Sequence, residues 1–186
     1  MRKSGIPLKD KWPIYSQVKL IPPYKLKELS LSLRKEKQTI ATVNGSFDLM
    51  HAGHLHILFE ASKLADCLIV AINTDDSIKR YKGENRPIIP LQYRLQMMTA
   101  IGFVDYVTFF DEDDPRDILE VIKPDFHVNG PEWGVECVEA DIVKKHGGQI
   151  HIITLKEGLS TSKIVETIHN LHDLKTGISE TSKSVS

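Results

Sequence analysis

Three histidines within six residues are the first feature of this sequence that could do chemistry. His51, His54 and His56 lie in the stretch NGSFDLMHAGHLHILFEASK, between a β-branched run and an apolar run with helical spacing. They could bind a metal ion, fill structural positions or donate hydrogen bonds to a phosphate. A zinc site needs a closed ligand set, but His56 would point away from the other two. The stretch also has no HExxH pattern and no paired cysteine. We therefore expect no protein-held metal ion.

The glycine between His51 and His54 favours the phosphate alternative. Gly53 lies where a helix should begin, and a helix N-terminus offers free N–H groups and partial positive charge to an anion. Without a side chain, it lets the anion approach the backbone, and the preceding turn 44–47 adds further N–H groups. His51 and His54 would supply donors that stabilise charge on a phosphoryl group in transfer. For His56, inside the helix, we expect a structural role.

The elements that must position these residues alternate along the chain. Apolar runs predict strands at 39–45, 67–73, 106–110, 125–130 and 149–155. Amphipathic segments and terminal signals predict helices at 24–37, 54–65, 90–102, 114–123, 135–148 and 160–174. Continuously apolar strands are buried on both faces, which indicates a parallel sheet. The expected fold is α/β, a Rossmann-like parallel sheet of about five strands with helices on both faces.

Composition sets limits on the class of protein. Twenty-four Lys and Arg nearly balance 25 Asp and Glu, which argues against a general nucleic-acid or membrane-surface binder. Two cysteines without CxxC spacing give no disulfide framework, and we expect a cytoplasmic protein. We predict an N-terminal arm and helix (1–38), one catalytic domain (39–174) and a disordered tail (175–186). Apolar helix faces are compatible with a homodimer or a higher homo-oligomer.

In a parallel α/β fold, ligands bind beyond the carboxyl ends of the strands. Five cations follow the second strand between residues 79 and 94, in a chain that is otherwise neutral. A run of charges is usually a solvated surface, but this position favours phosphate neutralisation, above all by Lys82 and Arg94. Asp75 would hydrogen-bond sugar hydroxyls or cap a helix. The acids at 111–114 precede a predicted helix, so we expect them to complement its dipole and take no part in catalysis.

At the level of motifs, the chain resembles a known family. GSFDLMHAGH, KGENRP and the Ser-Thr-Ser helix start at 160–162 are similar to the HxGH nucleotidylyltransferases of the cytidylyltransferase-like branch. Within that branch the similarity is strongest to adenylyltransferases that make ADP-heptose, and it covers about residues 25–173. It implies transfer of AMP from ATP to a sugar 1-phosphate, with D-glycero-β-D-manno-heptose 1-phosphate as the expected substrate, for lipopolysaccharide core synthesis. Mg²⁺ would enter with ATP, and a separate sugar kinase would act in the same pathway.

The resemblance also implies roles for individual residues. His51 and His54 would stabilise the α-phosphorus, with Lys82 and Arg94 as further catalytic residues. Nucleotide and phosphate contacts would come from Asn44, Gly45, Ser46, Phe47, Gly53, Lys79, Asn129, Gly130, Ser160, Thr161 and Ser162. Substrate contacts would come from Asp48, Asn73 and Asp75.

An alternative reaction stays open at this point. The chain could be a CTP-dependent cytidylyltransferase acting on glycerol 3-phosphate or a similar alditol phosphate. Those enzymes usually carry an arginine just before the final Ser/Thr segment, where this chain has LKEGLSTS, so the adenylyl reaction is favoured. Two further departures are Ser46 at a position that is often cysteine, and VNGPEW in the segment that we expect to border the base.

Overall fold

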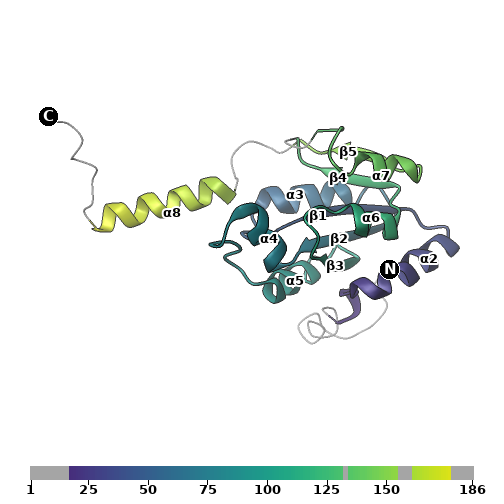
Figure 1. Ribbon diagram of the computed structural model, residues 1–186, viewed down its shortest axis with the longest axis horizontal. Coiled ribbons are helices and arrows are strands. Elements are labelled where there is room, and N and C mark those ends of the chain that lie inside the picture. Colours follow the sequence, from purple (N-terminus) through teal and green to yellow (C-terminus); the bar gives the residue numbers. More distant parts are fainter. Residues whose placement is uncertain (1–16, 132–133, 155–160, 177–186) are drawn as a thin grey trace.

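A five-stranded sheet in the order β3-β2-β1-β4-β5 forms the centre of the molecule (Figure 1). The computed structural model describes residues 17–131, 134–154 and 161–176. All the neighbouring strands pair in parallel, which confirms the predicted fold class. The strands are β1 (Ile40–Gly45), β2 (Cys67–Asn73), β3 (Tyr106–Phe110), β4 (Phe126–Asn129) and β5 (Gln149–Ile152).

Helices cover both faces of this sheet because its strands are apolar on both sides. On one face, α3 (Ala52–Ala61) and α5 (Leu91–Thr99) bury side chains against Leu68, Val70 and Ile72 of β2. The alternate residues of β2 pack on the other face against α2 (Leu26–Lys35) and α6 (Arg116–Ile122), with Val143 of α7 (Ala140–Lys145). This alternation follows from the period of two in a strand. It fixes which residues meet at the strand ends.

Most of the described elements differ from the predicted ones at one or both ends, and one helix was not predicted. A helix that we did not predict, α4 (Asp75–Lys82), follows β2 directly. The predicted helix 90–102 ends at Thr99, and the predicted helix 135–148 is shortened to α7. The final helix, α8, runs from Thr161 to Thr176, two residues past the predicted boundary.

The segment before β1 is partly built into the domain. Leu26 and Leu33 of α2 are buried in the second hydrophobic cluster, and η1 (Pro23–Lys25) leads into this helix. Leu20 forms a parallel bridge to Val107 on the edge strand β3, and Lys19 donates from Nζ to the carbonyl oxygen of Ile101 at 2.8 Å. Residues 1–16 and 177–186, which include most of the predicted arm and tail, lie outside the described residues.

The strand order places a crevice beside β1. The chain moves from β1 to β2 and β3 on one side and then returns to β4 on the other, so the order reverses between β1 and β4. Loops on the two sides of such a switch point diverge and leave room for a ligand at the carboxyl ends of the strands.

Across the described residues, no helix has the length and apolar character needed to cross a bilayer.

Candidate active site

A cavity of about 410 Å³ lies at the carboxyl ends of β1, β2 and β4, within the size range of small-molecule sites. Its walls include the residues that follow β1 and β4, so it lies at the switch point of the sheet. The sequence-predicted residues that line it are Asn44, Gly45, Ser46, Phe47, His54, Asn73, Lys82, Asn129 and Gly130.

Backbone N–H groups hold the rings of both His51 and His54 at the start of α3. The backbone N–H of Gly53 donates to His51 Nδ1 at 3.1 Å, and the backbone N–H of His51 donates to His54 Nδ1 at 3.3 Å. Each Nδ1 therefore acts as an acceptor and carries no proton, which places the ring proton of a neutral imidazole on Nε2. Within the described part of the chain, no hydrogen bond uses either Nε2. The local backbone thus presents both Nε2 groups as N–H donors, but only His54 lines the cavity, and His51 lies beside it.

Electrostatics keeps both rings neutral. Burial lowers the pKa of His51. Burial, followed by the charges of His51 and Lys82, lowers the pKa of His54 to about 4. The two ring centroids are 4.0 Å apart, and the ring of Phe47 lies 5.5 Å from that of His54. Phe47 is buried and has φ +46°, a strained value for a non-glycine residue that is typical of functional turns.

Lys82 brings a positive charge to the cavity from the end of α4. Its Nζ donates to Ser46 Oγ at 3.1 Å, and it lies 5.4 Å from the ring centroid of Tyr81. Burial, and then the charge of Arg86, lowers the pKa of this ammonium. The cavity therefore has a polar end, formed by Lys82, Ser46 and His54, that suits a phosphate group.

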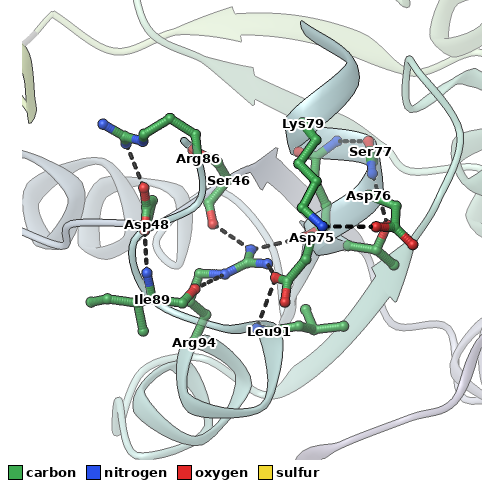
Figure 2. Close-up of polar contacts among 12 residues, drawn as sticks. Ser46, Asp48, Asp75, Asp76, Ser77, Lys79, Arg86, Ile89, Leu91 and Arg94 are labelled. Atoms are coloured by element: carbon green, nitrogen blue, oxygen red, sulfur yellow. Dashed lines mark hydrogen bonds and ion pairs between the residues drawn. The ribbon is translucent and has the colours of Figure 1, made fainter. Parts of the chain in front are cut away.

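Arg94 takes a different position from the one we expected. Its side chain is 0% exposed, it does not line the cavity, and its guanidinium joins four segments (Figure 2). It donates to the carbonyl oxygens of Ile89 at 2.9 Å, Ser46 at 2.7 Å and Asn73 at 2.8 Å. It also pairs with Asp75 at 2.6 Å. Arg94 and Asp75 are thus engaged with protein partners, and neither is among the residues that line the cavity.

Asp48 anchors the loop between α4 and α5 (Figure 2). Its carboxylate accepts hydrogen bonds from the backbone N–H groups of Ile88 and Ile89, each at 2.8 Å. It also pairs with Arg86, and its own side chain is 1% exposed. These contacts occupy the carboxylate that we expected at the substrate. They connect the turn after β1 to the loop that carries Gly83 and Arg86.

The remaining predicted residues lie around the cavity or outside the described residues. Lys79 does not line the cavity, and its Nζ pairs with Asp76 at 3.3 Å (Figure 2). Gly53 gives its N–H to His51, so this group is already bonded. Thr161 Oγ1 lies 3.5 Å from the carbonyl oxygen of Leu49, and α8 extends outward from this point (Figure 1). Ser160 lies outside the described residues, as does the Ser162 side chain.

The cavity includes residues that sequence reasoning missed. Tyr81, Asp113 and Asp114 line it on the side of β3, and Glu139 lines it beyond β4. We had expected the acids at 111–114 to complement a helix dipole. In the structure Asp113 pairs with Arg80 at 2.6 Å and Asp114 with Arg116 at 2.7 Å. Their position directly after β3 is the signal that could have identified them.

The carboxylates near the site are occupied by protein partners. Asp48 pairs with Arg86, and Asp75 pairs with Arg94. Within the described ranges, no group of three or more His, Cys, Asp or Glu side chains is arranged to hold a metal ion.

Comparison with known proteins gives one family and a consistent set of relatives. The model of the cytidylyltransferase-like family matches residues 42–167. "Bifunctional protein HldE" of Marinomonas sp. (strain MWYL1) is 42% identical over 148 residues, which cover 79% of this chain and 31% of that protein. The protein of the same name from Methylococcus capsulatus is 42% identical over 147 residues, covering 78% and 31% of the two chains. This chain therefore spans about a third of the length of these relatives.

Two solved structures share the fold. A lipopolysaccharide core biosynthesis protein from Thermoplasma volcanium GSS1 aligns with a TM-score of 0.52 and 28% identity, over 66% of this chain and 99% of that one. A pantoate-beta-alanine ligase from Francisella tularensis, solved with an ATP analogue and beta-alanine, aligns with a TM-score of 0.55 over 89% and 81% of the two chains. Its identity of 15% shows the fold alone.

Proposed function

We propose a specific reaction for this chain, which belongs to the cytidylyltransferase-like family of nucleotidyltransferases. The reaction is transfer of AMP from ATP to D-glycero-β-D-manno-heptose 1-phosphate, giving ADP-heptose and pyrophosphate for lipopolysaccharide core synthesis. The names of the HldE relatives and of the Thermoplasma protein support the pathway. The observation that carries the chemistry is His54, which lines the cavity with its Nδ1 held by a backbone N–H group, while the similarly held ring of His51 lies against it.

The proposed chemistry is an in-line displacement. A phosphate oxygen of the sugar 1-phosphate attacks the α-phosphorus of ATP, and the bond from that phosphorus to the oxygen bridging to the β-phosphate breaks. Pyrophosphate leaves with the bonding electron pair. No general base is required because a phosphate monoester is already an anionic nucleophile. Catalysis then consists of positioning and charge stabilisation.

The chain's own residues divide these tasks. His54, supported by His51, directs Nε2–H at the phosphoryl oxygens, and Lys82 adds a positive charge from the end of α4. Thr161 begins α8 beside Leu49 and offers a hydroxyl and a helix N-terminus to the departing phosphates. Mg²⁺ enters as part of the MgATP substrate, held mainly by the phosphates, in keeping with the paired carboxylates of the site.

Partners and location follow from this reaction. A sugar 1-phosphate substrate has to be made by phosphoryl transfer to a sugar, so we propose that a sugar kinase of the same pathway supplies the heptose 1-phosphate. The use of ATP places the reaction in the cytoplasm.

We also propose self-association as a homodimer or a higher homo-oligomer, because Val165, Ile168 and Leu171 are exposed at helical spacing on α8.

A matrix of substrates tests the proposal. Pyrophosphate release is measured with ATP, CTP, GTP and UTP, each against heptose 1-phosphate, other sugar 1-phosphates and glycerol 3-phosphate. We expect the highest kcat/KM with ATP and the heptose 1-phosphate. A clear preference for CTP with glycerol 3-phosphate would replace the adenylyl reaction by the cytidylyl one. Absence of pyrophosphate release in every combination would remove the catalytic function.

A further inference from the structure

A chain of buried polar side chains connects the interior of the sheet to the wall of the cavity beyond β4. Thr42 Oγ1 lies 2.7 Å from His127 Nδ1, and His127 Nε2 lies 3.2 Å from Glu139 Oε1. Asn129 donates from Nδ2 to the same Glu139 oxygen at 2.8 Å. His127 is 0% exposed and Glu139 is 3% exposed. The proposed transfer step uses neither side chain, although Glu139 and Asn129 line the cavity.

Glu139 fixes the orientation of the Asn129 amide. Burial raises the pKa of this carboxyl, but hydrogen bonds from His127 and Asn129 and the charge of His127 outweigh it and hold the pKa below its usual range. An ionised carboxylate can only accept hydrogen bonds. Turning the Asn129 amide over would set its oxygen against the carboxylate, so the Nδ2 group must face Glu139. Oδ1 is directed away, and no hydrogen bond to it is found among the described residues.

The charge distribution indicates which part of a nucleotide reaches Asn129. Lys82 and His54 line the phosphate end of the cavity, whereas the negative Glu139 would repel a triphosphate. Near Asn129 the cavity is lined by Val128 and Val138, which suit the flat apolar faces of a nucleobase. With its phosphates at the cationic end, a nucleotide would therefore place its base beside the Asn129 oxygen.

Asn44 supplies a second amide at the same place. Val43 of β1 pairs with Val128 of β4, so the next residues along, Asn44 and Asn129, emerge on the same face of the sheet. The Asn44 Oδ1 atom is buried and lacks a hydrogen-bond donor among the described residues, a state that is rare without a missing partner. One amino group has two hydrogens, which matches two neighbouring amide oxygens.

We infer that Asn129, held by Glu139, makes this site select adenine or cytosine, which carry an amino group where hypoxanthine, guanine and uracil carry a carbonyl. The inference rests on the proposed function and names the class of base that the same site accepts. Glu139 acts through Asn129 and is a positioning residue. A base with a carbonyl at this point would set its oxygen against the Asn129 oxygen, and once the base covers this acceptor it would be left unsatisfied.

The test compares ATP with ITP, whose base carries a carbonyl at C6 and a proton on N1 in place of the amino group and the bare N1 of adenine, and adds 2′-deoxy-ATP. We expect kcat/KM for ITP to be about 10–100-fold lower than for ATP in the wild-type protein, as for a buried acceptor left unpaired. In Glu139→Gln the glutamine amide can donate, so Asn129 can turn over and present Nδ2. The ATP/ITP ratio should then fall at least about tenfold. Glu136→Gln, an exposed residue paired with Lys144, is the matched control and should keep the ratio.

Several outcomes would overturn the inference. The first is an equal kcat/KM for ATP and ITP in the wild type, and the second is an unchanged ATP/ITP ratio in Glu139→Gln. The third is a lower kcat/KM with 2′-deoxy-ATP but not with ITP, which would mean that the Asn129 oxygen contacts the ribose. Circular dichroism checks that Glu139→Gln folds. If it does not, Asn129→Ser must lower the ratio instead. If no nucleotide is turned over, the proposed function fails, and calorimetric binding of ATP against ITP still decides the inference.

Discussion

Replacement of Arg94 by methionine tests how the site is held together. The guanidinium gives hydrogen bonds to the carbonyl oxygens of Ser46, Asn73 and Ile89 and pairs with Asp75. Leaving each of the three buried carbonyl acceptors without its donor costs about 1 kcal/mol or more. Loss of the partly exposed pair with Asp75 costs about another 1 kcal/mol. The sum is about 3–5 kcal/mol, in the range for breaking a buried charge pair. Total stabilities of about 5–15 kcal/mol leave the variant folded at low temperature.

Urea unfolding followed by circular dichroism measures this change. With a slope of roughly 2 kcal/mol per molar urea, the midpoint for Arg94→Met should fall by about 2 M. Arg80→Met is the matched control, because Arg80 makes a comparable contact to Asp113 from a side chain that is 43% exposed. Exposed pairs contribute about 1 kcal/mol or less, so its midpoint should move by about 0.5 M at most. Equal small shifts in the two variants would refute the positioning role of Arg94.

Two further predictions concern the groups at the cavity. Because the folded pKa of His54 is lowered from 6.5 to about 4, the unfolded chain gains its proton first as the pH falls. The free energy of unfolding should be steady above about pH 6.5 and decrease towards pH 4, by about 2 kcal/mol after allowance for partial exposure. His54→Gln should flatten this dependence in denaturation curves. Lys82→Met should lower kcat/KM for ATP by about 10–100-fold through loss of a charge-assisted contact, measured as pyrophosphate release.

Each of these predictions has its own control. For the pH dependence, His146→Gln removes a partly exposed histidine that pairs with Glu120. The free energy of unfolding of this variant should still decrease towards pH 4, because His54 is unchanged. An unchanged pH dependence in His54→Gln would show that His54 is not held neutral. For Lys82, the control is Lys79→Met, whose side chain contacts Asp76 outside the cavity. Equal losses of kcat/KM in the two lysine variants would mean that Lys82 acts only through the overall positive charge of α4 and makes no direct contact with a phosphate.

The sequence was sufficient for the fold because its strands are strongly apolar. The bounds predicted for β2 and β3, at 67–73 and 106–110, agree with the structure. The helix α4 was missed because Asp75–Lys82 has almost no apolar face: Ile78 is its one buried apolar residue. Its start depends on the Thr74 hydroxyl, which accepts from the Ser77 N–H, and its position depends on tertiary contacts with the segments around it.

The site was predictable where function depends on residues after a strand, and less so where it depends on long-range contacts. The turn after β1, His54, Lys82 and Asn129 all line the cavity as expected. The sequence placed Arg94 in a cluster of cations, and nothing local indicates that carbonyl oxygens from distant segments surround it. Glu139 was missed because its role exists only through His127 and Asn129.

The most direct test of the account is turnover by His51→Ala and His54→Ala. Pyrophosphate release from ATP and heptose 1-phosphate is measured at neutral pH, with circular dichroism to confirm that each variant is folded. Removal of one donor to the transition state should lower kcat by about 10²–10³-fold in each case. Folded variants with near-normal kcat would contradict the claim that these histidines stabilise the transferring phosphoryl group.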